Sequence, residues 1–168
     1  MTDFASIQMM DRAEAEKKGL FHVIGQEIDD RYMEELKKLV LSPEAIKRMA
    51  DSLKIVYTPL HGTGNLPVRR VLKELGFTQV QVVPEQELPD GAFPTVSYPN
   101  PEDPKAFELA LKLAKEKDAD IVLATDPDAD RLGVYCKDTV NGGYISFTGN
   151  MSGMLIAEYI FCLLYTSD

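Results

Sequence analysis

Cysteine and histidine are scarce in this chain of 168 residues. The two cysteines, Cys136 and Cys162, are too few for a disulfide framework or for a zinc site built from several thiolates. The two histidines, His22 and His61, lie far apart in the sequence. Free thiols are typical of a reducing compartment, so we expect a cytoplasmic protein.

Long apolar runs and an excess of positive charge are also lacking. The longest apolar stretch, residues 154–165, contains Glu158 and is too short to span a bilayer. Residues 1–11 have neither the basic segment nor the apolar core of a signal peptide. The net charge is −9, from 18 basic and 27 acidic residues, and an acidic chain repels polyphosphate. We therefore expect neither a membrane nor a nucleic acid as a partner.

Strand-like and helix-like segments alternate regularly along the chain. This order predicts an α/β fold with a mostly parallel sheet flanked by helices and an antiparallel hairpin at one end. In such sheets ligands bind at the carboxyl ends of the strands. We expect strands over residues 54–58, 79–83, 120–125, 132–137 and 144–147, and either a strand or a connector over residues 20–24. We expect helices over residues 3–18, 27–40, 66–75 and 104–116. A short helix should begin at Ser42 and Pro43, and a last helix should be capped by Thr148 or Asn150.

Three aspartates, Asp126, Asp128 and Asp130, directly follow the buried-type strand at residues 121–125. On a helix, successive members of this set would point about 200° apart. On a flat strand they would spread over roughly 13 Å. A curved loop lets all three carboxylates close on one cation. Three hard oxygen ligands suit Mg²⁺, so the spacing predicts a magnesium site.

Other interpretations of the same residues are an acidic solvated turn, an EF-hand and a phosphatase. Carboxylates at alternate positions repel one another unless a cation binds, which disfavours the plain turn. An EF-hand needs glycine and glutamate where this chain has Arg131 and Lys137. A haloacid-dehalogenase-type phosphatase would use Asp126 as nucleophile and Asp128 as acid, although Asp130 stands where that family has Thr or Val. This phosphatase and a non-catalytic cation-binding module stay open.

Two further side chains are candidates for contact with a substrate. Arg131 adjoins the aspartates, and its planar fork of donors suits a phosphate, although it can also simply neutralise the acidic group. His61 lies in a glycine-containing loop at residues 59–65, between a strand and a helix, where exposed backbone N–H groups often bind anions. Its side chain is either an acid/base facing the ligand or a structural hydrogen-bonding group. A proline-rich loop at residues 84–101 is too long for a simple connector.

Four motifs occur together and in order in this chain: TPLHGTG (58–64), DGAFPTVSYPNPED (90–103), DADIVLATDPDADRLGV (118–134) and FTGNMSG (147–153). Together they closely resemble the α-D-phosphohexomutase family, which includes phosphoglucomutase and phosphomannomutase. The resemblance extends from about residue 20 to residue 160. The family has four domains, and these motifs match the second, which carries the metal loop. The S-H-N-P, E-E-S-G and S-G-T-E motifs of the other three domains are absent from this sequence.

The resemblance implies a role for each candidate residue. Asp126, Asp128 and Asp130 match the three Mg²⁺ ligands, Arg131 matches an arginine that faces the active site, and His61 lies in a loop near that cleft. The implied reaction interconverts a hexose 1-phosphate and 6-phosphate through a phosphoserine and a bisphosphate intermediate. The implied partners are a sugar phosphate, a sugar bisphosphate and the other domains of the same enzyme.

Residue ranges follow from the same resemblance. We expect residues 1–45 to lead from a first domain, residues 46–150 to form the α/β metal-binding domain, and residues 151–168 to begin a helix toward a third domain. The end of the chain, from residue 161, departs from the family pattern. It is a truncation, a foreign tail or a divergent helix end. The isolated chain is expected to be inactive as a mutase.

Overall fold

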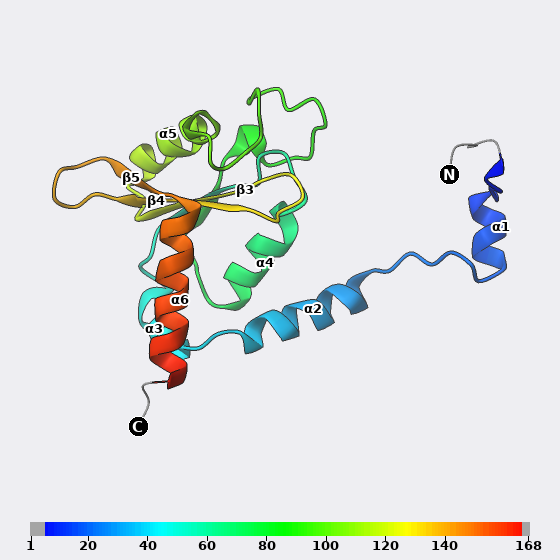
Figure 1. The fold of residues 1–168 in the computed structure, drawn as a ribbon, viewed down its shortest axis with the longest axis horizontal. Helices are drawn as coiled ribbons and strands as arrows, with labels where there is room; N and C mark the ends of the chain where they lie inside the picture. Colours follow the sequence, from blue (N-terminus) through cyan, green and yellow to red (C-terminus); the bar gives the residue numbers. More distant parts are fainter. Residues whose placement is uncertain (1–5, 166–168) are drawn as a thin grey trace. The chain divides into compact units, whose positions relative to one another are not determined.

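The computed structural model describes residues 6–165 and divides the chain into two compact units, Met1–Glu35 and Leu36–Asp168. The first unit contains α1 (Arg12–Lys17) and most of α2 (Gln26–Lys38) (Figure 1). Residues 21–25 form no strand. The second unit contains the sheet and the remaining helices.

The predicted helix over residues 3–18 is too long at its beginning. The Asp11 carboxylate accepts hydrogen bonds from the amides of Ala13 and Glu14, at 2.9 and 3.3 Å, so the helix begins after this cap. Residues 7–11 have no regular structure, and Phe4 lies outside the described residues. The helix predicted over residues 27–40 is confirmed as α2.

The sheet has five strands in the order β2-β1-β3-β4-β5. The first three strands are parallel, and β3, β4 and β5 pair antiparallel in turn, so the predicted parallel sheet with a hairpin at one end is confirmed. The strands are β1 (Ile55–Thr58), β2 (Val80–Val82), β3 (Ile121–Thr125), β4 (Leu132–Lys137) and β5 (Tyr144–Phe147).

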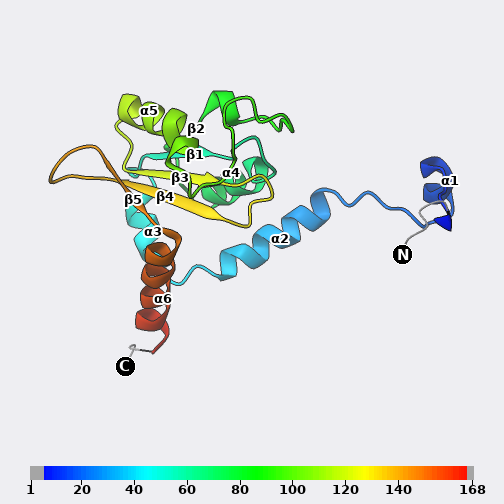
Figure 2. The same ribbon diagram turned by 45° about the horizontal axis from the view of Figure 1, so that its top comes forward.

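Helices cover both faces of the parallel part of the sheet. α4 (Asn65–Glu74) lies on one face and α5 (Glu108–Lys117) on the other (Figures 1 and 2). All four residues of β1 are buried, as is typical of a parallel strand covered on both sides. The core contains Val56, Leu60, Val83, Ala106, Phe107, Ala110, Ala114, Ala119, Val122 and Ala124.

Short elements complete the connections. α3 (Pro43–Met49) begins at the predicted proline, but the Ser42 side chain makes no capping hydrogen bond. The proline-rich loop opens with a 3-10 turn, Pro84–Gln86, and another 3-10 turn, Pro104–Phe107, leads into α5.

The last helix, α6 (Gly149–Tyr165), begins at one of the two predicted caps. The Thr148 hydroxyl accepts a hydrogen bond from the amide of Met151 at 3.2 Å. No residue of α6 is buried. Within residues 6–165, no helix is both long enough and apolar enough to cross a membrane. The predicted tail is helical as far as Tyr165, and its last three residues lie outside the described part.

Candidate metal centre

Two loops leave the sheet side by side at the carboxyl ends of β1 and β3. The two strands are paired in parallel, with Thr58 opposite Ala124, so the segments that follow them begin at the same edge. The glycine loop (residues 59–65) follows β1, and the acidic loop (residues 126–131) follows β3. This is the edge at which open α/β sheets bind ligands.

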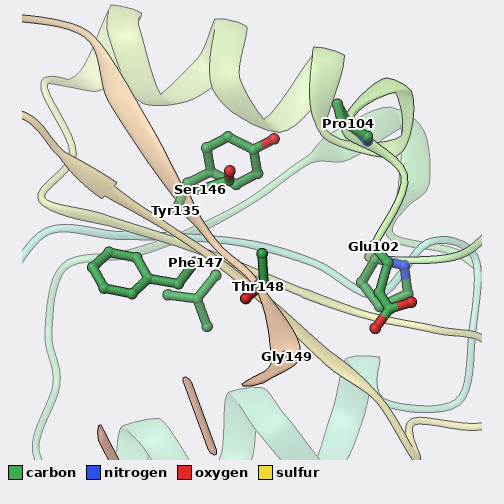
Figure 3. Close-up of a pocket in the computed structure, with 9 residues that line it drawn as sticks. Glu102, Pro104, Tyr135, Ser146, Phe147, Thr148 and Gly149 are labelled. Atoms are coloured by element: carbon green, nitrogen blue, oxygen red, sulfur yellow. The ribbon is translucent and has the colours of Figure 1, made fainter. Parts of the chain in front are cut away.

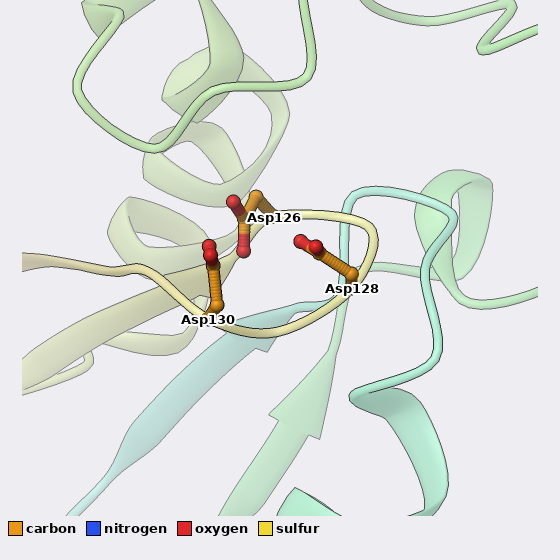
Figure 4. A group of neighbouring side chains, drawn as sticks. All are labelled: Asp126, Asp128 and Asp130. Carbon is orange, nitrogen blue, oxygen red and sulfur yellow. The ribbon is translucent and has the colours of Figure 1, made fainter.

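The acidic loop brings the three predicted aspartates together. One carboxylate oxygen from each of Asp126, Asp128 and Asp130 lies within 4.8 Å of the other two. Asp126 is buried, whereas Asp128 and Asp130 are exposed. Figure 4 shows the three carboxylates turned toward one another across the curve of the loop.

The backbone of the loop is curled around Asp126. Its carbonyl accepts a hydrogen bond from the amide of Ala129 at 3.0 Å, and its carboxylate oxygen Oδ1 accepts one from the amide of Arg131, also at 3.0 Å. Ala129 has a φ of 60°, in the left-handed region that alanine rarely adopts. The loop is therefore curved, as it must be for carboxylates at alternate positions to converge.

The electrostatics of the cluster favour a bound cation. The pKa of Asp130 is raised above its ordinary value, first by a hydrogen bond with Asp126 and then by the negative charges of Asp128 and Asp126. The nearby charge of Arg131 acts in the opposite direction. A carboxylate held beside two others is harder to ionise, and a divalent cation relieves that repulsion.

The donor set fits Mg²⁺. Octahedral Mg²⁺ with bonds of about 2.1 Å places neighbouring oxygens about 3 Å apart and opposite ones about 4.2 Å apart. In the structure the three carboxylate oxygens lie within 4.8 Å of one another, which is close to this range. All three donors are hard oxygen atoms, and the exposure of Asp128 and Asp130 leaves room for water or phosphate ligands.

Arg131 lies beside the acidic cluster. Its Nε atom is 3.7 Å from Oδ2 of Asp126 and 3.8 Å from Oδ1 of Asp130, distances typical of an ion pair without a hydrogen bond. The Arg131 side chain is 53% exposed, so about half of its surface is open to solvent. The structure thus accounts for charge neutralisation, and contact with a phosphate stays a prediction.

His61 is held inside the protein by both ring nitrogens. Nδ1 lies 3.2 Å from the Leu88 carbonyl oxygen, and Nε2 lies 2.9 Å from the Thr95 hydroxyl. Because a carbonyl can only accept, Nδ1 carries the proton in this arrangement and Nε2 accepts from Thr95 when the ring is neutral. The residue is only 5% exposed. These contacts support the structural interpretation of His61, and its catalytic role stays a prediction.

The amides at residues 60–63 of the glycine loop are not available to an anion, and an anion site in this loop stays a prediction. The amide of Leu60 donates to the Thr58 hydroxyl at 3.1 Å, and the amide of His61 donates to the Gln86 carbonyl at 3.0 Å. The amides of Gly62 and Thr63 donate to the carbonyls of residues 59 and 127, both at 2.8 Å. These four N–H groups are already satisfied inside the chain, so this part of the loop offers none of them to an anion.

A cavity of about 330 Å³ lies at the start of α6 (Figure 3). It contains a carboxylate, Glu102, and no basic side chain lines it, so it does not suit a phosphate. None of the predicted site residues lines this cavity. Its lining includes Glu102, Pro104, Tyr135, Ser146, Phe147 and Thr148.

The fold and this site together define an α/β domain that presents a loop with three converging carboxylates at the edge of a parallel sheet. Residues 30–142, more than half of the chain, match the family described as phosphoglucomutase/phosphomannomutase, alpha/beta/alpha domain II. The chain therefore belongs to the phosphoglucomutase/phosphomannomutase family, as its motifs indicated.

Individual relatives agree with this assignment. The chain is 43% identical to human glucose 1,6-bisphosphate synthase over 137 residues, covering 81% of this chain and 22% of that protein. It is 38% identical to a phosphoglucomutase of Staphylococcus epidermidis over 145 residues, covering 86% of this chain and 25% of that one. A crystal structure of a family protein from Burkholderia thailandensis matches with a TM-score of 0.59 and 28% identity, over 80% of this chain and 26% of that one. The chain thus spans about a quarter of the length of these relatives.

Proposed function

We propose that this chain is the magnesium-holding domain of a sugar-phosphate mutase of the cytoplasm. The observation that carries the proposal is the convergence of three carboxylates in a chain that belongs to a phosphomutase family. Asp126, Asp128 and Asp130 would hold the ion. When bound, Mg²⁺ neutralises charge on a phosphoryl group during its transfer.

The residues of the chain have separate tasks in this proposal. Asp126 is the fixed ligand, because burial and the amide of Arg131 hold its carboxylate in place. Asp128 and Asp130 are exposed and complete the ligand set from the open side of the loop. The Arg131 guanidinium, half exposed beside them, orients a phosphate oxygen through its planar fork.

The transferred phosphoryl group comes from elsewhere in the enzyme. The family's phosphoserine motif, S-H-N-P, does not occur in this sequence. Phosphoryl transfer depends on positioning the reacting group, so the chain alone is expected to have no mutase activity. The substrate is a sugar phosphate, and the relatives include enzymes named phosphoglucomutase and phosphoribomutase. The family match does not favour the phosphatase alternative, in which Asp126 would be the nucleophile.

Calorimetric titration of the purified chain with Mg²⁺ tests the proposal. We expect weak but saturable binding that EDTA abolishes, because water must supply the remaining ligands. Asp128→Asn should weaken binding by about tenfold or more, since one anionic ligand is lost. The matched control is Asp51→Asn, which makes the same change in charge at an exposed aspartate outside the loop. Equal affinity in wild type and Asp128→Asn, or no binding by the wild type, would refute the proposed site.

A further inference from the structure

We propose that Thr63 is a positioning residue that clamps the acidic loop in the shape required for metal binding. This inference rests on the proposed function, since it concerns the same metal site. Thr63 donates twice to the carbonyl oxygen of Pro127, from its amide at 2.8 Å and from its hydroxyl at 3.1 Å. That carbonyl belongs to the peptide bond that leads into Asp128, so Thr63 fixes the peptide from which this ligand projects.

The glycines on either side of Thr63 permit the close approach that the clamp needs. A Cβ atom on Gly62 would lie 2.6 Å from the Pro127 carbonyl oxygen and 2.8 Å from its carbon, and backbone atoms cannot easily move away. A Cβ atom on Gly64 would lie 2.6 Å from the hydroxyls of Thr125 and Tyr57, and 3.2 Å from the Cβ atom of Ala129. The glycine loop therefore runs against the acidic loop at residues 127 and 129 and against the end of β3.

The backbone that leads to Thr63 is itself held by several hydrogen bonds. Leu60 and His61, with φ values of 47° and 63°, occupy the left-handed region that such residues rarely adopt. The hydroxyl of Thr58 accepts from the amide of Leu60, and Gln86 accepts through its side chain from Thr58 at 2.7 Å and through its carbonyl from His61. A conformation of this kind persists only when several contacts determine it. In this network His61 has a structural role, because its amide and both of its ring nitrogens are hydrogen-bonded within the chain.

A rigid loop matters because its three carboxylates repel one another. In a loop free to open, Mg²⁺ binding would have to supply the free energy that brings the charges together and orders the backbone. A loop already closed by Thr63 avoids part of that cost, as with any preorganised site. The clamp bonds the backbone and not a carboxylate, so its loss should weaken metal binding and leave the core intact.

The test compares Thr63→Val, which lacks the hydroxyl, with Thr63→Ser, which retains it. We expect Thr63→Val to bind Mg²⁺ about three- to tenfold more weakly in calorimetry, because one of the two clamping bonds is lost. Thr63→Ser should bind within about twofold of the wild type. Thr139→Val, at an exposed threonine of the hairpin turn, is the matched control and should bind normally. Thr63→Ala gives a second loss-of-hydroxyl variant, and a normal circular dichroism spectrum confirms folding.

A second measurement needs no metal. The amide of Ala129 donates to the Asp126 carbonyl inside the curled acidic loop, so its hydrogen exchange in EDTA measures how often this turn opens. We expect faster exchange in Thr63→Val and wild-type exchange in Thr63→Ser. Unchanged exchange and unchanged affinity in Thr63→Val would overturn the clamp. A wild-type chain that fails to bind Mg²⁺ overturns the proposed function instead, and exchange at Ala129 then decides the clamp by itself.

Discussion

Replacing Gly133 with alanine should destabilise the protein through a collision in the core. Gly133 is a buried residue of β4 and pairs with Ala124 in β3. A Cβ atom at this position would lie 2.5 Å from the Pro101 carbonyl oxygen and 2.8 Å from Cζ of Phe107. Phe107 is fully buried and packs against the ring of Tyr135 at a centroid distance of 4.6 Å, so it has little room to shift.

The expected magnitude follows from overpacking. Ordinary contacts begin near 3.4 Å, so both neighbours must move by more than half an ångström. Inserting one methyl group into a packed core costs about 1–3 kcal/mol, and we expect about 2–3 kcal/mol here because one neighbour is backbone. The same substitution at Gly153 meets nothing within 4 Å, on an exposed position of α6. There alanine should stabilise the helix by about 0.5–1 kcal/mol.

Urea unfolding of the purified chain, followed by circular dichroism, measures both variants. With a slope of about 2 kcal/mol per molar urea, Gly133→Ala should lower the midpoint by about 1–1.5 M. Gly153→Ala should leave the midpoint equal or slightly raised. If Gly133→Ala unfolds at the wild-type urea concentration, β4 does not pack against Pro101 and Phe107 as described, and the argument from close approach is wrong.

Three further predictions concern charges and a hydroxyl. In a full-length mutase that contains this domain, Arg131→Lys should lower kcat by about tenfold while the urea midpoint stays unchanged, because an ammonium cannot reproduce the guanidinium fork. Normal turnover in this variant would mean that Arg131 only neutralises the charge of the aspartates. The hydrogen bond and the charge of Lys137 hold the pKa of Asp118 below its ordinary value. The Asp118 carboxylate therefore stabilises the folded state at pH values above its pKa in the unfolded chain. This stabilisation is lost as the pH falls through the lower pKa of the folded state. Asp118→Asn should therefore lower the urea midpoint slightly at pH 7 but not at about pH 2, and a difference that persists in acid would contradict this. Tyr144→Phe should lower the free energy of unfolding by about 1 kcal/mol, because its hydroxyl proton is shared between two carbonyl oxygens near the end of α5, at 2.9 and 2.8 Å. An unchanged thermal midpoint would show that this hydrogen bond does not stabilise the fold.

Local patterns in the sequence were enough to predict most of the fold. The β-branched run at Ile55–Thr58 and the apolar run at Ile121–Thr125 are strands because each residue of a strand covered on two faces must be apolar or small. Prolines at helix starts and the Asn141-Gly142-Gly143 turn marked element ends correctly. The sequence failed where a local cap competed with a longer apolar pattern, as at Asp11 in the predicted first helix.

The candidate site divides in the same way. Asp126, Asp128 and Asp130 were predictable as a group, because alternate carboxylates in a curved loop after a buried strand can converge. The sequence alone could not reveal that Thr63 bonds the carbonyl of a residue 64 positions away. Nor could it show that His61 is enclosed by its own chain, because that depends on which loops meet at the sheet edge.

The sequence by itself thus determined the order of the elements, the candidate metal ligands and the family, since these depend on residue type and spacing. The tertiary structure decided which backbone groups of the glycine loop were free. In the sequence, this loop beside a helix N-terminus indicated an anion site. In the folded chain, the parallel pairing of β1 and β3 places the glycine loop against the acidic loop, and its amides at residues 60–63 are satisfied by the protein itself.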